Sequence, residues 1–274
     1  MIPDQFRSER EKHRYFSALS ETEKISALNE IVRKSEYTVF LGGAGVSTES
    51  GIPDFRSKDG LYRKKDSRFE RFRPEYLLSH ECLKKHPEVF FAYARENLDA
   101  RGVKPNAAHF KLAEMEKAGK LNGLVTQNID GLHQKAGSRE VQEIHGTMMR
   151  GHCVSCRKAY SGDFIFDYKS NQGNQGGQGI PICTECGAMV RPDVVLYGEL
   201  LAQPDYENAL NMINLADCLI IGGTSLEVGS AAQLAHLFHG RYLVIINKGK
   251  TRMEGKADLV FHDSIGKIMS QIQL

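Results

Sequence analysis

Four cysteines form the clearest chemical pattern in this chain of 274 residues. They make two hooks, Cys153-x-x-Cys156 and Cys183-x-x-Cys186, which are separated by 26 residues. Each hook can place two thiolates on one tight turn, and two such turns complete a tetrahedron around Zn²⁺. The separation exceeds the usual ~15–20 residues, but added loop length costs little free energy. Because four cysteines leave no open coordination position, the pattern predicts one structural zinc ion per chain, with free or redox-active thiols as the alternative.

A glycine-rich turn follows the apolar segment Tyr37–Leu41, which reads as a buried strand. Residues 42–45 (GGAG) carry few side-chain atoms, so their N–H groups can approach a phosphate closely. The dinucleotide-binding fingerprint G-x-G-x-x-G is met only in part, because Thr48 stands at its third glycine position. The loop Asp54-Phe55-Arg56 that comes next has a polar and aromatic tip, which a purely structural turn does not need.

Two further groups of polar residues follow apolar segments. Residues 126–130 (TQNID) come directly after the strand-like segment Gly123–Thr126, and His145 closes the short apolar run Val141–Ile144. Open α/β sheets place functional groups at the ends of their strands, and an imidazole with a pKa near ~6.5 can act as a general base. A structural histidine, and a turn held by the side chains of residues 126–130, are the alternative interpretations.

These groups need a scaffold, and the rest of the sequence indicates a parallel sheet. Ser20–Glu23 has the form of a capping box, and a second helix is expected from Asn106 through Ala118. Residues 218–221 and 242–246 read as buried strands, with a helix at 228–238 between them. Continuous apolar strands that alternate with helices predict an α/β fold, a Rossmann-like parallel sheet with helices on both faces.

Residues 151–192 interrupt this alternation and carry the four cysteines, so we expect them to form a small inserted zinc-binding module. Within them, residues 171–179 are rich in Gly and Gln and have too little apolar content to pack, which predicts a mobile loop. The large domain is then expected to comprise residues 1–150 and 193–274, and part of residues 57–105 is expected to join the small one.

Composition restricts the possible partners. The chain has 36 basic and 34 acidic residues, for a net charge of +2, which argues against a general nucleic-acid or membrane-surface binder. The basic segment 58–73 is interpreted as a solvated loop, although a protein substrate with acidic neighbours could use it. The N-terminus has no apolar signal region and no apolar run approaches the ~18 residues that span a bilayer, so a cytoplasmic protein is expected.

The order of these motifs resembles the sirtuins, the NAD-dependent protein deacylases. Besides the glycine-rich turn and the cysteine hooks, the resemblance rests on TQNID at 126–130, IHG at 144–146, VVLYGE at 194–199, GTSL at 223–226 and IN at 246–247. These blocks span residues 37–265, which is most of the chain. The resemblance implies that NAD and Zn²⁺ are the cofactors, and that the active cleft lies between a Rossmann-type domain and the zinc domain.

The resemblance also assigns residues. It implies that His145 and Asn128 are catalytic, that Phe55 shields the reactive ribose carbon, and that residues 127–130 hold the ribose and the nicotinamide carboxamide. The loop after the first strand would contact the diphosphate, and residues 224, 225 and 247 the adenosine half. The full set of implied NAD-binding residues is Gly43, Ala44, Gly45, Thr48, Asp54, Phe55, Arg56, Gln127, Asn128, Ile129, Asp130, His145, Gly223, Thr224, Ser225 and Asn247.

In the family, the segment that matches residues 194–199 binds an acyl-lysine peptide as an added strand. The substrate-binding residues that this implies are Val195, Tyr197, Gly198 and Glu199. Three positions depart from the family pattern. Tyr197 stands where Phe is usual, Ser230 where many relatives have Pro, and Gly42 where Thr is common.

The reaction that the resemblance implies is removal of an acyl group from lysine with release of nicotinamide and O-acetyl-ADP-ribose. Relatives that remove succinyl or malonyl groups carry a Tyr-x-x-Arg pair, whereas here Lys65 stands three residues after Tyr62, which favours acetyl. Longer or acidic acyl groups, and mono-ADP-ribosyl transfer to protein, are the enzymatic alternatives. A zinc-ribbon module that binds nucleic acid is the alternative of another class, which the charge balance disfavours. The sequence leaves the oligomeric state open, with a monomer favoured.

Overall fold

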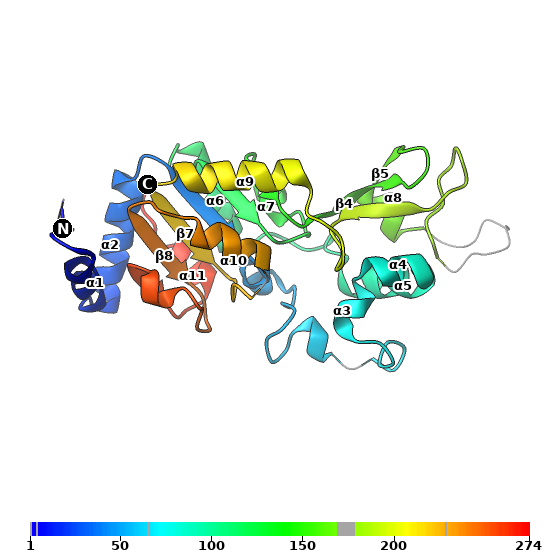
Figure 1. Ribbon diagram of the computed structural model, residues 1–274, viewed down its shortest axis with the longest axis horizontal. Coiled ribbons are helices and arrows are strands. Elements are labelled where there is room, and N and C mark those ends of the chain that lie inside the picture. Colours follow the sequence, from blue (N-terminus) through cyan, green and yellow to red (C-terminus); the bar gives the residue numbers. More distant parts are fainter. Residues whose placement is uncertain (1, 4, 65, 169–178, 228) are drawn as a thin grey trace.

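The computed structural model describes residues 2–3, 5–64, 66–168, 179–227 and 229–274. The expected loop at 171–179 therefore lies, apart from Gly179, outside the described residues. Figure 1 shows an elongated molecule in which a large sheet with its helices occupies the N-terminal end. A second unit, with the helices α3 to α5 and a small sheet, occupies the other end.

The large sheet has six strands in the order β3-β2-β1-β7-β8-β9, and every pair of neighbours is parallel. The strands are β1 (Thr38–Gly42), β2 (Gly123–Thr126), β3 (Val141–Glu143), β7 (Cys218–Gly222), β8 (Tyr242–Ile246) and β9 (Leu259–Phe261). The chain builds outward from β1 in one direction and from β7 in the other. The strand order therefore reverses between β1 and β7, and ligands of such sheets bind at that point, outside the carboxyl ends of the strands.

Helices cover both faces of this sheet, which confirms the predicted fold class. The alternation of side chains along each strand sends Phe40 and Ile220 to one face and Val39 and Leu219 to the other. One face packs on α2, α6 and α11, and the other on α9 and α10. The bounds of these helices are α2 (Glu21–Lys34), α6 (Ala107–Lys117), α9 (Gln203–Leu215), α10 (Gly229–His236) and α11 (Ile265–Met269).

Local signals in the sequence set several of these helix ends. Ser20 and Glu23 form the expected capping box of α2, in which each side chain bonds the backbone N–H of the other residue. Asn106 caps α6 by accepting the Ala108 N–H at 3.0 Å, and the chain after α6 turns at Gly119 with φ of 69°. Between these helices lie short 3₁₀ turns, η1 (Ala44–Val46), η2 (Thr48–Ser50), η3 (Leu61–Arg63) and η4 (Glu254–Lys256).

The second unit has a core of its own. A three-stranded antiparallel sheet, in the order β5-β4-β6, comprises β5 (Ala159–Ser161), β4 (Gly146–Cys153) and β6 (Val190–Val194). It packs with α3 (Pro74–Leu77), α4 (His80–Lys85), α5 (Pro87–Asn97) and α8 (Gly162–Phe166). Because buried side chains of residues 69–94 and 148–196 share this core, we propose that part of residues 57–105 belongs to the small domain, as the sequence led us to expect.

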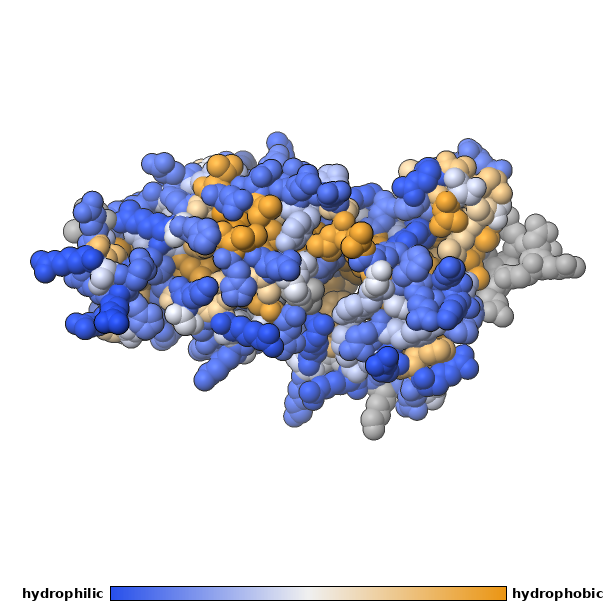
Figure 2. Space-filling view, in the orientation of Figure 1, coloured by the Kyte–Doolittle hydropathy of each residue, from blue (hydrophilic) through white to orange (hydrophobic). Residues whose placement is uncertain are grey.

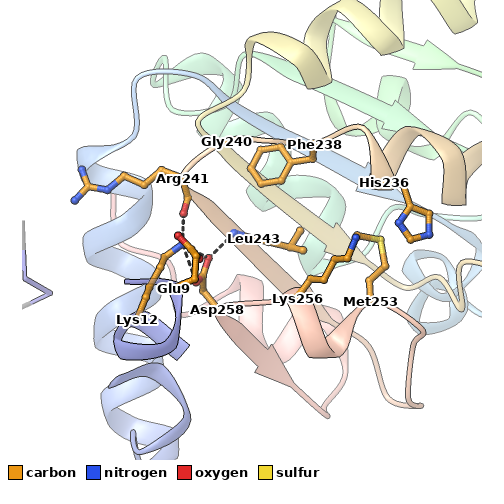
Figure 3. A pocket seen from close by; sticks show the side chains of 10 residues that line it. All are labelled: Glu9, Lys12, His236, Phe238, Gly240, Arg241, Leu243, Met253, Lys256 and Asp258. Carbon is orange, nitrogen blue, oxygen red and sulfur yellow. Dashed lines mark hydrogen bonds and ion pairs between the residues drawn. The ribbon is translucent and has the colours of Figure 1, made fainter. Parts of the chain in front are cut away.

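The N-terminal segment is fastened to the far edge of the large sheet (Figure 3). Helix α1 (Glu9–Ser17) places Lys12 against Asp258, with Nζ and Oδ1 2.8 Å apart, and Nζ also donates to the Arg241 carbonyl. The other oxygen of Asp258 accepts the Leu243 N–H of β8 at 2.9 Å. Phe16 is buried against Tyr242. The first residues therefore complete the core beside β8 and β9.

Apolar side chains reach the surface at separate places. Figure 2 shows them over α9 and α10 and on the second unit, while most of the rest of this face is hydrophilic. Among the exposed large hydrophobic residues are Leu215, Leu237, Val154 and Ile182. Within the described residues, no helix combines the length and the apolar character needed to cross a bilayer.

Two buried histidines sit where α6 meets α7 (Leu132–Ala136). The rings of His109 and His133 lie 4.7 Å apart, and both side chains are fully enclosed. Burial lowers the pKa of His109 to about 4 and that of His133 to about 3, the latter with a contribution from His109. Three of the four ring nitrogens have no hydrogen-bond partner among the described residues.

This pair predicts an acid-sensitive fold. Burial disfavours protonation of both rings in the native state, whereas the histidines of the unfolded chain take up protons near pH 6.5. The contribution of the pair to the free energy of unfolding is therefore fully present above pH 6.5 and is lost as the pH drops toward 4. Each ring should contribute a slope of up to ~1.4 kcal/mol per pH unit in the free energy of unfolding. Denaturant titrations between pH 7 and 4.5 should show a shallower slope for His133→Leu. The exposed His239→Leu should keep the wild-type slope, and equal slopes in all three proteins would contradict the prediction.

Candidate active site and metal site

The loop after β1 is held against the loop after β7 by direct backbone contact. Gly45 donates its N–H to the Gly223 carbonyl at 2.8 Å, and Gly43 donates to the Gly222 carbonyl at 3.1 Å. A Cβ atom on Gly45 would lie 2.8 Å from the Gly223 Cα, and one on Gly43 would lie 2.7 Å from the Thr224 Cβ. The glycines are therefore required for close packing of the two loops at the point where the strand order reverses, and not only for access to a ligand.

A partly buried polar cluster lies beside this junction; we use "polar cluster" for Ser47, Gln127, Asn128, Asp130, His145 and Thr224. Ser47 donates its hydroxyl to Asp130 Oδ2 at 2.6 Å and accepts from Asn128 Nδ2 at 3.1 Å. Asp130 Oδ1 accepts the Leu132 N–H at 2.9 Å. Burial raises the pKa of Asp130, and the bonds from Ser47 and the backbone oppose the shift without reversing it. Ser47 thus joins the loop after β1 to the loop after β2.

Gln127 and Thr224 extend the polar cluster to the loop after β7. Gln127 donates Nε2 to Thr224 Oγ1 at 3.0 Å, and Thr224 Oγ1 also accepts the Leu226 N–H at 3.2 Å. Thr224 is buried, whereas Ser225 is exposed. The loops after β1, β2 and β7 therefore contribute side chains to two neighbouring hydrogen-bonded groups, Ser47–Asn128–Asp130 and Gln127–Thr224.

His145 follows β3 and stands at the entrance to β4. Its Nδ1 lies 3.1 Å from the Gln127 carbonyl oxygen, and its Nε2 lies 3.2 Å from Ser230 Oγ on α10. Its own carbonyl accepts the Val195 N–H at 2.9 Å. Burial lowers the pKa of His145, and the bond to the Gln127 carbonyl opposes that shift. The lowered pKa favours the neutral ring, which is the form that a general base needs.

The loop that contains Asp54, Phe55 and Arg56 folds back on itself and reaches the loop after β7 through Arg56. Asp54 Oδ1 accepts the N–H groups of Arg56 and Ser57 at 3.0 and 2.8 Å, so this carboxylate is used to shape the turn. Phe55 packs on Tyr62 with ring centroids 5.4 Å apart. Arg56 reaches outward, and its Nε lies 3.6 Å from the Glu227 carboxylate.

The segment that follows β6 is fixed by a backbone bridge to the second unit. Tyr197 donates its N–H to the Leu78 carbonyl and accepts the His80 N–H, both at 3.0 Å. Its hydroxyl lies 2.8 Å from that of Tyr62 and 3.4 Å from Arg56 Nη2. The Tyr197 side chain is partly exposed, at 42%. The hydroxyl that sets this residue apart from Phe therefore has two partners.

Both carboxylate oxygens of Glu199 form hydrogen bonds with other residues of the chain. It accepts from Arg191 Nη1 and Nη2 at 2.6 and 2.9 Å, from the Leu196 N–H at 3.0 Å, and contacts His80 Nδ1 at 2.8 Å. Burial opposes ionisation, but these bonds outweigh it and lower the pKa of Glu199 to about 2. The carboxylate holds the turn at residues 196–199 rather than pointing freely toward a ligand.

Other residues implied by the resemblance are more distant from the polar cluster. Asn247 lies at the end of β8, where its side chain donates to the Gly249 carbonyl at 2.8 Å. The pocket in Figure 3, lined by residues of α1, α10, β8 and η4, contains none of the site residues expected from the sequence. A second pocket, of about 340 Å³, borders the polar cluster only through Asp130.

The four cysteines of the hooks converge in the second unit. Their sulfur atoms all lie within 4.8 Å of one another, with Cys153 and Cys186 3.3 Å apart and Cys156 and Cys183 3.5 Å apart. A tetrahedron with Zn–S distances of ~2.3 Å has edges of about 3.8 Å, so the four sulfurs fit one zinc ion. Among the described residues, no non-cysteine ligand joins this group. The donor set is that of a structural zinc site.

Tyr160 is a functional residue of this site that the sequence analysis missed. Its hydroxyl donates to Cys183 Sγ at 3.1 Å and accepts the Thr184 N–H at 2.9 Å. This hydroxyl is the first cause of a lowered pKa of Cys183, which falls to about 6. Such a bond stabilises the thiolate that binds metal. Tyr160 lies outside both hooks, on β5, and only pairing of β5 with β4 brings it to the metal site.

Comparison with known proteins places the chain among one group of enzymes. A sequence model of the Sir2 family matches residues 43–230. The chain is 49% identical to an NAD-dependent protein deacetylase of Clostridium perfringens, over 91% of this chain and 98% of that protein. It is also 49% identical to one of Cutibacterium acnes, over 88% of this chain and 94% of that protein.

Solved structures agree with the sequence relatives. A Sir2 variant in complex with a deacetylated p53 peptide and 3'-O-acetyl-ADP-ribose superimposes with a TM-score of 0.81 at 33% identity, covering 90% of this chain and 96% of that one. A Sir2 protein bound to a propionylated peptide gives a TM-score of 0.78 at 32% identity, covering 90% and 95%. Both likenesses extend over the large sheet and the second unit together.

The metal site yields a prediction that requires no enzyme assay. Tyr160→Phe should release zinc about ten-fold faster to a chromogenic chelator than the wild type, because Cys183 loses the donor that stabilises its thiolate. Tyr168→Phe is the matched control, since Tyr168 packs on Phe164 in the same module. Equal release rates for the wild type and Tyr160→Phe would show that the hydroxyl does not act on the metal site.

Proposed function

This chain belongs to the Sir2 family, and we propose that its polar cluster removes acetyl groups from lysine side chains of proteins with NAD as co-substrate. The observation that carries the proposal is the placement of His145. Its ring is fixed through Nδ1 on the carbonyl of Gln127, and the Gln127 side chain bonds Thr224 in the loop after β7, next to the point where the strand order reverses. The similar proteins of Clostridium perfringens and Cutibacterium acnes are both named as NAD-dependent protein deacetylases.

The residues around the junction fit NAD on their own chemistry. The amide of Asn128, the carboxyl of Asp130 and the hydroxyl of Ser47 bond one another there, and among the described residues no charged side chain contributes to the pKa shift of Asp130. Such uncharged, partly enclosed groups suit the carboxamide and ribose of a dinucleotide. Ala44 lies between the two glycines that pack on the loop after β7, is itself half-buried, and would present its backbone to the diphosphate. When bound, NAD supplies the ADP-ribose group that accepts the acetyl group as nicotinamide leaves.

His145 supplies the general base. The Gln127 carbonyl can only accept a hydrogen bond, so Nδ1 carries the proton of the neutral ring and Nε2 holds the lone pair that can take up a proton. We assign to Nε2 the removal of a proton from a ribose hydroxyl. Asn128 is held by Ser47 in a position to orient that ribose, and Ser47 thereby becomes part of the site.

Two loops exclude water and seat the substrate. Phe55, packed on Tyr62, would cover the reacting ribose, and Arg56 would exchange its contact with Glu227 for the cofactor. The acyl-lysine chain would enter beside Val195 and Tyr197. Because the Glu199 carboxylate is occupied by Arg191 and His80, its part is to hold this segment in place.

The same proposal includes the setting in which the enzyme works. A site of four thiolates requires reduced cysteines, which the cytoplasm maintains, so we place the protein there. Its substrates are acyl-lysine proteins or peptides, bound by a monomer with one zinc ion. The zinc holds the second unit in shape and takes no part in the chemistry, since four cysteines fill its coordination.

The base assignment is tested by His145→Ala. This variant should lose at least about a hundred-fold of its NAD-dependent deacetylation, since general-base catalysis contributes roughly 10²–10⁴-fold, while calorimetry should still detect NAD binding. Turnover is measured by mass spectrometry of an acetyl-lysine peptide incubated with and without NAD. His239→Ala, an exposed histidine away from the site, should retain full activity. Full activity of His145→Ala would refute the assignment, and radiolabel from NAD on protein would favour ADP-ribosyl transfer.

The acyl preference is tested with matched peptides. An acetyl-lysine peptide should be turned over faster than its succinyl counterpart, because the sequence lacks the Arg of the Tyr-x-x-Arg pair and Tyr62 already bonds Tyr197. The test compares kcat/KM for the two peptides at equal NAD concentration. Similar kcat/KM values would overturn the preference for acetyl without affecting the assignment of His145.

A further inference from the structure

Ser230 stands second in α10 and contacts the general base directly. Its Oγ lies 3.2 Å from His145 Nε2, the nitrogen that carries the free lone pair of the neutral ring. Ser230 is half-buried, as is the imidazole that it meets. The sequence marked this position as a departure, because many members of the family resembled have Pro there, and Pro has no side-chain hydrogen-bonding group.

The direction of each hydrogen bond follows from the chemistry of the partners. With the proton on Nδ1 committed to the Gln127 carbonyl, Nε2 of the neutral ring can only accept, so the Ser230 hydroxyl donates. A hydroxyl can also accept. Once Nε2 takes up a proton, Ser230 Oγ becomes the acceptor for the new Nε2–H without any movement of the two side chains.

Without such an acceptor, the surroundings of His145 disfavour the ring that is protonated on both nitrogens. Burial is the main cause that disfavours the protonated form of His145, and the opposing cause is the Gln127 carbonyl. Neither cause is a charged side chain. The other elements packed at this point contribute the Val195 N–H, which binds the His145 carbonyl, and the uncharged Thr224–Gln127 pair. Nε2 thus faces the Ser230 hydroxyl as its protein partner.

We propose that Ser230 is a positioning residue for His145, donating to Nε2 while the ring is neutral and accepting from Nε2–H after the ring has taken a proton. The catalytic meaning of this inference rests on the proposed function, whereas the contact between Ser230 and His145 is independent of it. A hydrogen bond to a charged group is stronger than one to a neutral group, so the second state gains more from Ser230 than the first. Ser230 therefore raises the proton affinity of a base that burial would otherwise weaken.

The test is an NMR titration of the His145 ring in the free protein, which needs no turnover. The ring signal is identified by its loss in His145→Gln, among the 10 histidines of the chain. Ser230→Ala should lower the midpoint of the titration by about half to one pH unit, a three- to ten-fold loss of proton affinity. Ser230→Thr keeps the hydroxyl and should titrate within a few tenths of a unit of the wild type. Ser230→Pro, the residue of many relatives, should behave like Ser230→Ala.

The outcomes separate this inference from the proposed function. An unchanged or raised midpoint in both Ser230→Ala and Ser230→Pro would overturn the role of Ser230, as would an equal shift in Ser230→Thr. In the deacetylase assay, kcat/KM for NAD is measured as a function of pH. The midpoint on the acid side of that profile should shift between the wild type and each Ser230 variant in the same direction and by the same amount as the NMR midpoint. A wild type without NAD-dependent deacetylation would refute the proposed function, while the titration would still decide what Ser230 does.

Discussion

The contact between Gly45 and Gly223 is the constraint on which the site depends. Two loops from β1 and β7 approach so closely that a single Cβ atom at Gly45 would overlap the opposing backbone. Gly223 adopts a φ of 59°, which glycine reaches without the cost that an L-residue meets. The contact fixes the loops that carry Ser47, which bonds Asp130, and Thr224, which bonds Gln127, at the point where the strand order reverses. Any displacement of the loops would separate the residues that we assign to the cofactor and to the base.

The electrostatics of the site follow from burial rather than from ion pairs. Both Asp130 and His145 have pKa values shifted toward their neutral forms, and burial is the largest cause in each case. A neutral imidazole is a competent base, and it must then carry a positive charge in the same enclosed place. The hydrogen bonds from His145 to the Gln127 carbonyl and to Ser230 are the compensation that the structure offers for that charge.

How much could be predicted from the sequence depended on whether a signal was local. The cysteine hooks specify their own turns, so their convergence follows from spacing, and the apolar strands separated by helices predicted the parallel sheet. Ser47 and Tyr160 were missed because each acts through a partner far away in the sequence, Asp130 and Cys183. A serine in a glycine-rich loop or a tyrosine beyond a cysteine hook has no local pattern that distinguishes it from an ordinary surface residue.

The second unit also depends on contacts between residues that lie far apart in the sequence. The block at residues 194–199, which is expected to contact substrate, is held in place by its own protein: Arg191 bonds Glu199, and the Tyr197 backbone bonds residues 78 and 80. The helices α3 to α5, which precede the cysteines by more than fifty residues in the chain, share a core with β4 and β6. A change in that core would therefore reach Tyr197 through two backbone hydrogen bonds, and His145 through the bond from Val195. A zinc ion held by the four cysteines would therefore support the proposed general base only indirectly, by keeping this second unit in shape.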